Sequence, residues 1–203
     1  NFEGNERKYV DDAIDQGWVS TGGAYITKLE EQMAGFLHVE KVAACQSGTS
    51  ALHLSLLECN VQPGDMVIVP TLTFIAAVNP VHYQFAEPVF MDCDDSLCMD
   101  PVKLRKFCEK ECHVEQKQLI HTASGKKIKA VIVVHVFGNL ADMESIMDIA
   151  EEYHLKVIED AQRHWVPITR KDVLPESMRE QSEILEHTHL MGIRSLQPAV
   201  AVQ

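Results

Sequence analysis

The chain has 203 residues and a formal net charge of −12, from 18 Lys and Arg against 30 Asp and Glu. Its apolar content of 46% excludes a disordered chain and predicts one globular unit with a substantial core. The acidic balance argues against nucleic-acid binding, which needs clustered Lys and Arg. No apolar run approaches the roughly 20 residues that span a bilayer, and no basic and apolar leader opens the sequence. We therefore expect a cytoplasmic protein that binds neither nucleic acid nor membrane.

Two helices are predicted first, at residues 3–16 and 26–37. The segment between them mixes an aromatic ring, hydroxyl groups and two adjacent glycines. Trp18, Ser20 and Thr21 of this loop are candidate substrate contacts. An ordinary interhelix turn with a packing tryptophan explains the segment equally well.

From residue 40 to 160, short β-branched runs alternate with amphipathic helical stretches. The predicted strands are Val42–Cys45, Met66–Val69, Val89–Met91, Ala130–Val136 and Lys156–Ile158. The predicted helices are Thr49–Glu58, Phe74–Tyr83, Pro101–Glu115 and Asp142–His154, and Asp100 before Pro101 has the pattern of an N-cap. This alternation predicts an α/β fold with a mostly parallel sheet and helices on both faces.

A candidate anion site follows the first predicted strand. Gly48, Thr49 and Ser50 open the next helix, where backbone N–H groups, the positive end of the helix dipole and two hydroxyls suit a phosphate group. The alternative is plain N-capping by Thr49. The segment matches neither the P-loop nor the dinucleotide-binding glycine pattern, which argues against a nicotinamide-dependent enzyme.

Two further candidates stand at the ends of later strands, the edge at which open α/β sheets bind ligands. Phe74 follows the second strand and would stack on a planar ring, or else anchor the core. Asp160 closes an apolar strand, where a carboxylate is costly to bury without a partner. It would hold a proton on a heterocyclic nitrogen, or else cap a following helix.

His135 and the six cysteines point less clearly to a functional site. His135, at the end of the fourth predicted strand, would face the substrate or be a core histidine with satisfied hydrogen bonds. The six cysteines form no C-x-x-C pair, so reduced thiols are expected rather than a metal site or disulfides.

Residues 1–161 resemble the DegT/DnrJ/EryC1/StrS family of sugar aminotransferases, which depend on pyridoxal 5′-phosphate (PLP). The resemblance lies in NFEGNERKYV, GWVSTGG, SGTSALHLSL, PGDMVIVPTLTF, AEPVF and VIEDA. It implies part of the large domain of an aspartate-aminotransferase-like (type I) PLP enzyme, a homodimer, and amino transfer from glutamate or glutamine to a nucleotide-linked keto sugar. The opening NFEGNE and the GWVSTGG loop look most like the branch that acts on UDP-4-keto-6-deoxy-N-acetylhexosamines. By position, Gly48, Thr49 and Ser50 would hold the PLP phosphate, Phe74 would cover the ring and Asp160 would meet the pyridine nitrogen.

The lysine that forms the Schiff base in this family is missing from its expected place. It should lie beyond the acid strand in a motif similar to S-F-N-x-x-K, which does not occur here. Lys171 is the only lysine after Asp160, and its surroundings do not match. Arg163 stands where the family has Gln, His or Glu near the cofactor. No catalytic residue is therefore assigned, and the chain is expected to be a truncated, inactive product.

A lost base after the Ala161 codon would explain the change. Each true codon would then join the third base of one residue to the first two bases of the next. His164–Trp165 would encode Leu, Trp165–Val166 and Met191–Gly192 would each encode Gly, and a lysine codon fits across Ile193–Arg194. Residues 162–203 are therefore expected to be a frameshifted, poorly ordered tail that leaves the sheet without its remaining strands. The alternative is a real, short, non-catalytic module that binds PLP or a nucleotide sugar, or a partner subunit.

Overall fold

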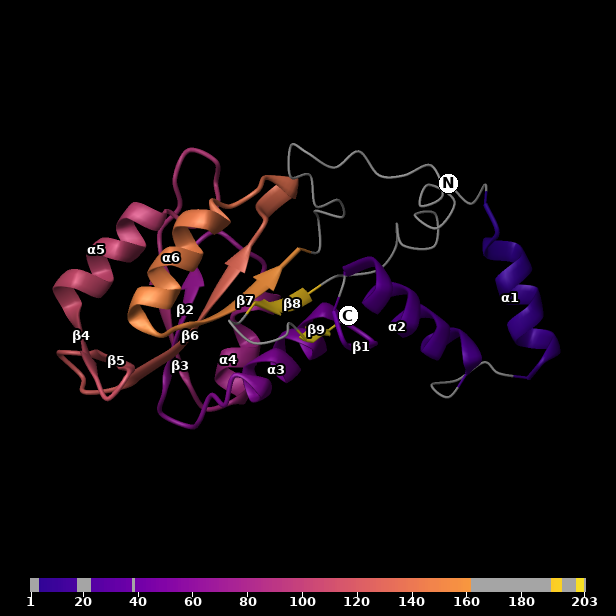
Figure 1. The fold of residues 1–203 in the computed structure, drawn as a ribbon, viewed down its shortest axis with the longest axis horizontal. Coiled ribbons are helices and arrows are strands. Elements are labelled where there is room, and N and C mark those ends of the chain that lie inside the picture. The colour runs from indigo at the N-terminus through magenta and orange to yellow at the C-terminus, as the bar shows by residue number, and fades with distance from the viewer. Residues whose placement is uncertain (1–3, 18–22, 38, 162–190, 195–199, 203) are drawn as a thin grey trace.

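The computed structural model describes residues 4–17, 23–37, 39–161, 191–194 and 200–202. Its central sheet contains β1 (Val42–Ala43), β2 (Met66–Pro70), β3 (Glu87–Met91), β6 (Lys127–Val134), β7 (Lys156–Asp160), β8 (Met191–Arg194) and β9 (Val200–Val202). From one edge to the other their order is β1-β9-β8-β7-β6-β2-β3 (Figure 1). The parallel pairing of β3 with β2, β2 with β6 and β6 with β7 confirms the predicted α/β fold.

Helices cover both faces of the sheet. On one face, α3 (Gly48–Glu58) and α4 (Asn79–Tyr83) pack on side chains that include Ile132 and Ile158. On the other, α5 (Pro101–Glu111) and α6 (Met143–Tyr153) pack on side chains that include Val133 and Val157 (Figure 1). Successive residues of β6 and β7 thus serve opposite cores, as strand geometry requires. The central strands are buried on both sides, which explains their continuous apolar sequences.

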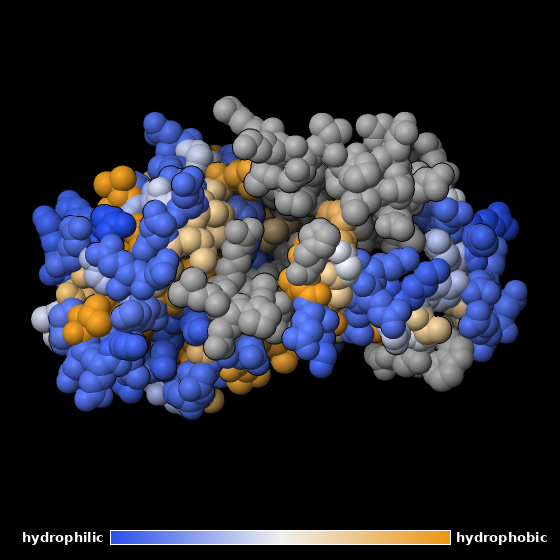
Figure 2. Space-filling model, viewed as in Figure 1, coloured by the Kyte–Doolittle hydropathy of each residue, from blue (hydrophilic) through white to orange (hydrophobic). Residues whose placement is uncertain are grey.

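The helices begin where local sequence favours a start. Asp100 accepts hydrogen bonds from the backbone N–H groups of Val102 and Lys103, so the predicted cap of α5 is confirmed. Asp142 accepts one from the N–H of Ser145 at the start of α6. These caps satisfy N–H groups that have no partner within their own helix. Figure 2 shows mainly hydrophilic side chains over α5, whose buried side chains face the sheet.

Two predicted helices are shorter than expected. The predicted helix to Glu115 ends at Glu111, and β4 (Cys112–Glu115) forms an antiparallel hairpin with β5 (Gln118–His121). Gln116 and Lys117 both have positive φ, which allows the tight two-residue turn. The hairpin buries Leu119, and its strand β5 pairs with β6. The stability gained from these contacts outweighs the helix propensity of the segment.

The predicted helix from Phe74 to Tyr83 is also divided. The 3₁₀ turn η1 (Ile75–Ala77) precedes α4. Phe74 itself has an extended backbone before that turn.

The described part of the tail differs from the expected sheet without further strands. β8 runs antiparallel to β7 and to β9, and β9 pairs in parallel with β1. Strand pairing uses backbone groups, so a short segment can cover an open strand edge whatever the origin of its sequence. The expectation of a poorly ordered tail at residues 162–190 and 195–199 lies outside the described residues.

The N-terminal helices α1 (Glu6–Asp15) and α2 (Ala24–Leu37) meet through a few side chains. The rings of Tyr9 and Tyr25 pack edge to face with centroids 5.4 Å apart, and Tyr25 donates a hydrogen bond to Asp12. No residue of α1 is buried, whereas Met33 of α2 is fully buried beside Val42. Among the described residues, no helix has the length and apolar character needed to cross a membrane.

Candidate functional site

A cavity of about 260 Å³ opens where β2, β6 and β7 end. We call it the Asp160 cavity; its lining residues are Leu72, Thr73, Phe74, Ala76, Ala77, Val134, His135, Val136, Phe137 and Asp160. These three strands are parallel neighbours, so their carboxyl ends and the turns that follow meet at one edge of the sheet. The volume of the Asp160 cavity is just below the roughly 300–1,000 Å³ of typical ligand pockets.

Asp160 is the buried acid of this cavity. It is the last residue of β7, pairs in register with Val134 of β6 and is only 6% exposed. Its backbone carbonyl accepts a hydrogen bond from the N–H of His135 at 3.1 Å. The main chain is thereby held in the sheet, and among the described residues Asp160 is the one acidic residue that lines this largely apolar cavity. A carboxylate at this position can form a charge-assisted hydrogen bond with a cationic or proton-sharing ligand atom.

Two phenylalanines supply aromatic surface to the cavity. Phe74 is 63% exposed, so the alternative that it anchors the core is wrong. Phe137 is 69% exposed and adopts a left-handed conformation with φ 56°. The sequence interpretation passed over Phe137, although it follows β6 much as Phe74 follows β2. An aromatic residue just after a strand is the signal that would have found it.

Thr49 and Ser50 lie in the first turn of α3, next to this region. Ser47, rather than Thr49, is the N-cap: its Oγ accepts from the N–H of Ser50 at 3.2 Å and lies 3.0 Å from the Ser50 Oγ. Gly48 is buried, while Thr49 and Ser50 are half-buried. α3 contacts β7 and η1, and its Ala51 shares a core cluster with Ala77 and Val134 from the cavity lining. The hydroxyl-bearing turn is therefore adjacent to the Asp160 cavity without lining it.

His135 follows the end of β6 and is 2% exposed. Its Nδ1 accepts from the N–H of Ala141 at 3.2 Å, so the ring proton lies on Nε2, which donates to Glu159 Oε1 at 2.8 Å. Both ring nitrogens thus have protein partners, as in the core-histidine interpretation. Glu159 was not singled out from the sequence.

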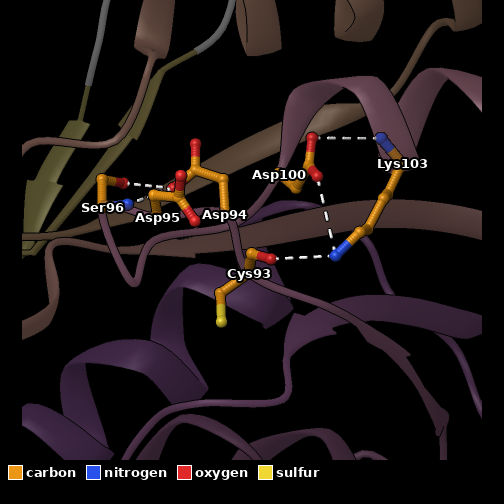
Figure 3. Close-up of a pocket in the computed structure, with 6 residues that line it drawn as sticks. All are labelled: Cys93, Asp94, Asp95, Ser96, Asp100 and Lys103. Carbon is orange, nitrogen blue, oxygen red and sulfur yellow. Dashed lines mark hydrogen bonds and ion pairs between the residues drawn. The ribbon is translucent and has the colours of Figure 1, made fainter.

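A second cavity, of about 510 Å³, lies beyond the end of β3 (Figure 3). We call it the Lys103 cavity; it is lined by Cys93, Asp94, Asp95, Ser96, Asp100 and Lys103. Lys103 Nζ donates to the carbonyl of Cys93 at 3.0 Å and forms an ion pair with Asp100 at 3.7 Å. The N–H of Ser96 donates to Asp94 Oδ1 at 2.8 Å. Most of the charged groups here are therefore bonded to one another and to the backbone.

The cysteines form no disulfide in the structure, which describes all six of them. Burial raises the pKa of Cys59 and that of Cys108 to about 12, so both remain thiols at neutral pH. Within the described ranges, no cluster of His, Cys, Asp and Glu has the geometry to hold a metal ion. The candidate substrate contacts Trp18, Ser20 and Thr21 lie outside the described residues.

Comparison with known proteins shows the family of this chain. The model of the DegT/DnrJ/EryC1/StrS aminotransferase family matches residues 1–164. The chain belongs to this family. Among solved structures, a DegT DnrJ EryC1 StrS aminotransferase from Brucella abortus has a TM-score of 0.68 and 32% identity, over 78% of this chain and 40% of its own. NtdA from Bacillus subtilis, solved with bound cofactor PMP, has a TM-score of 0.65 and 30% identity, over 78% of this chain and 33% of its own.

The curated relatives include sugar aminotransferases. GDP-perosamine synthase of Escherichia coli O157:H7 is 40% identical over 79% of this chain and 40% of its own length. The UDP-N-acetyl-3-dehydro-alpha-D-glucosamine 3-aminotransferase of Acidithiobacillus ferrooxidans is 41% identical over 65% of this chain and 32% of its own length. Members of the family bind pyridoxal phosphate. The chain spans about 40% of the length of the first of these relatives.

Proposed function

We propose that this chain carries the PLP-binding part of an enzyme that transfers an amino group to a nucleotide-linked sugar. The observation that supports this most is the convergence of Phe74 and Asp160 on one cavity at the carboxyl edge of the sheet. The hydroxyl-bearing first turn of α3 stands beside that cavity. An aromatic surface, a buried acid and an anion-binding helix start are the parts that a phosphorylated pyridine ring requires.

These residues fit the cofactor as follows. Asp160 is nearly buried, so its carboxylate would form a strong charge-assisted hydrogen bond and hold a proton on the pyridine nitrogen. Phe74 would cover one face of the ring. Gly48, Thr49 and Ser50 would hold the phosphate through N–H groups and hydroxyls at the start of α3. When bound, pyridoxal phosphate supplies an electron sink for the amino-transfer chemistry.

The proposed substrate is a nucleotide-linked 4-keto-6-deoxy sugar, which would become the 4-amino sugar. The similarity to GDP-perosamine synthases supports a nucleotide sugar. Another relative is named a 3-aminotransferase, so the choice of position 4 for amination is a separate, more specific part of the proposal. Glutamate or glutamine is the proposed amino donor. We propose a cytoplasmic homodimer as the working form, with Trp18, Ser20, Thr21 and His135 near the substrate.

We further propose that this chain is inactive in transamination and that residues 162–203 arose by a frameshift. The sequence contains no S-F-N-x-x-K motif after Asp160, and Lys171 does not stand in matching surroundings. Without a lysine at the cofactor, no group of the chain would carry the proton between substrate and cofactor carbon. The coding DNA tests the frameshift directly: restoring one base after the Ala161 codon should produce a lysine codon across Ile193–Arg194. A frame that encodes no lysine there would contradict the idea.

Cofactor titration tests the binding proposal on the chain as it exists. Pyridoxamine 5′-phosphate, which needs no Schiff base, should bind and be detected by calorimetry. Pyridoxal 5′-phosphate should bind without a borohydride-reducible adduct at any single lysine, as judged by peptide mass spectrometry. Failure of both compounds to bind would contradict the proposed site, and one stoichiometric lysine adduct would contradict the proposed inactivity.

A second candidate function is a non-catalytic module or partner subunit that binds PLP or a nucleotide sugar. The pairing of β8 with β7 and of β9 with β1 favours it, because a tail that joins the sheet is compatible with a stable short protein. Removal of residues 162–203 separates the two interpretations. A binding module should lose cooperative unfolding with its tail, whereas a frameshifted product should retain it.

A further inference from the structure

His135 occupies a junction between β7 and the turn that carries Phe137. Its backbone N–H donates to the carbonyl of Asp160, and its ring donates through Nε2 to Glu159. Its Nδ1 accepts from the N–H of Ala141, six residues further along the chain. One side chain thus connects the end of β7 to both ends of the turn after β6.

The ring of His135 bonds to groups on the face of the sheet opposite Asp160. Ala141 and Val157 belong to the core beneath α5 and α6, and Glu159 follows Val157 by two residues. Ile158 belongs to the core beneath α3 and α4, and Asp160 follows it on that face. The ring nitrogens of His135 are therefore directed at the protein framework, and the residue acts on the cavity through other groups.

The residue whose position depends on these hydrogen bonds is Phe137. It lies in the turn between His135 and Ala141, which is closed by the hydrogen bond from the Ala141 N–H to the His135 ring, and it has φ 56° and ψ 16°. A non-glycine residue in this conformation is strained and persists only where its surroundings hold it. Asn139 also stabilises this turn, because its Nδ2 donates a hydrogen bond to the carbonyl of Ser96 at 2.8 Å.

We propose that His135 is a positioning residue, which acts with Glu159 to hold the turn that presents Phe137 to the Asp160 cavity. The ligand part of this proposal rests on the proposed function. Glu159 and the Ala141 N–H select the tautomer together: the proton on Nε2 is donated to Glu159, and Nδ1 accepts from Ala141. Loss of the Glu159 acceptor removes one of the two groups that favour this tautomer, which weakens the hydrogen bond from Ala141 and loosens the turn that carries Phe137.

The test compares Glu159→Ala and Glu159→Leu, which remove the acceptor, with Glu159→Gln, which keeps an oxygen at the same position. Glu159→Leu retains side-chain volume in case Glu159→Ala does not fold. Glu152→Ala is the matched control, because Glu152 pairs with Arg105 at 2.6 Å on the surface between α5 and α6. Urea unfolding verifies that each variant is folded.

The first measurement needs no ligand. Nitrogen NMR of the His135 ring should report the Nε2–H tautomer in the unaltered chain, in Glu159→Gln and in Glu152→Ala. In Glu159→Ala and Glu159→Leu the two tautomers should mix, and the Ala141 amide should exchange with solvent about tenfold faster. Folded acceptor-free variants that keep the single tautomer and the protected amide would overturn the proposal.

The second measurement is the dissociation constant of pyridoxamine 5′-phosphate. It should rise about tenfold in the acceptor-free variants, and by no more than about threefold in Glu159→Gln. Glu152→Ala should leave it unchanged. Equal weakening by Glu159→Ala and Glu152→Ala would overturn the role of His135. If the unaltered chain binds no pyridoxamine 5′-phosphate while the NMR result is as expected, the proposed function is contradicted and the positioning of the turn is upheld.

Discussion

The Asp160 cavity and the Lys103 cavity both lie beyond strand ends, yet they differ in chemistry. The Lys103 cavity is the larger, at about 510 Å³ against about 260 Å³, but its Lys and most of its acids are bonded to one another or to nearby backbone and side-chain groups (Figure 3). The Asp160 cavity combines a nearly buried acid with two exposed aromatic rings. A position at the carboxyl edge of a sheet therefore does not make a site by itself; the chemistry of the side chains that line the cavity must also suit a ligand.

The largest effect should come from the buried acid. Asp160→Asn keeps the size of the side chain and removes its charge, so a charge-assisted hydrogen bond worth about 1.5–3 kcal/mol is lost. The dissociation constant of pyridoxamine 5′-phosphate should rise about ten- to hundredfold, measured by calorimetry. Asp95→Asn, in the Lys103 cavity, is the control and should leave binding unchanged. Equal responses of the two variants would remove the distinction between the cavities.

A smaller effect is expected from the aromatic wall. Phe74→Ala should weaken binding of the same compound by about three- to tenfold, since an aromatic stacking contact contributes about 0.5–1.5 kcal/mol. Phe90→Ala is the matched control, because Phe90 is 55% exposed on β3 and Phe74 is 63% exposed. Thermal unfolding should change little in both variants. Retention of full affinity in Phe74→Ala would exclude Phe74 as a ring contact.

The smallest effect concerns the charges around the Lys103 cavity. The hydrogen bond from Lys103, helped by the N–H of Cys93, lowers the pKa of Asp92. A carboxyl with a lowered folded-state pKa stabilises the fold above its unfolded pKa of about 3.9, and this contribution is lost as pH falls through the folded value. Asp92→Asn should therefore reduce the fall in Tm between pH 6 and pH 3. Because the pair is exposed, the difference should be small and should shrink in high salt. An unchanged pH profile would show that the ion pair contributes nothing to stability.

Several candidate site residues could be proposed from the sequence because their signals are local. Thr49 and Ser50 follow a strand and open a helix, and Asp160 closes an apolar strand, so each position follows from patterns a few residues long. The identity of the helix cap was missed, because Ser47 and Thr49 are equally suitable by residue type. Glu159 was missed for a different reason: its importance comes from the ring of His135, 24 residues away in the chain.

The hairpin of β4 and β5 illustrates the same limit in the fold. The segment at Cys112–Glu115 continues a helical pattern, and only its pairing with Gln118–His121 makes it a strand. The same limit applies to the two strands of the tail, because the sequence around them shows no alternation of strand and helix patterns. These strands are Met191–Arg194 and Val200–Val202. Their place in the sheet depends on the available backbone edges of β7 and β1.

The amino-acid sequence by itself determined the α/β class, the start of α3, the acid at the end of β7 and the family, because each depends on residue order over short distances. Tertiary structure decided which strand ends are neighbours, and with them the meeting of Phe74, Phe137 and Asp160 at one cavity. It also decided the tautomer of His135, which depends on Glu159 and Ala141 together. The physical reason is that hydrogen-bond and packing partners across a sheet are chosen by strand order and register, which local residue patterns do not encode.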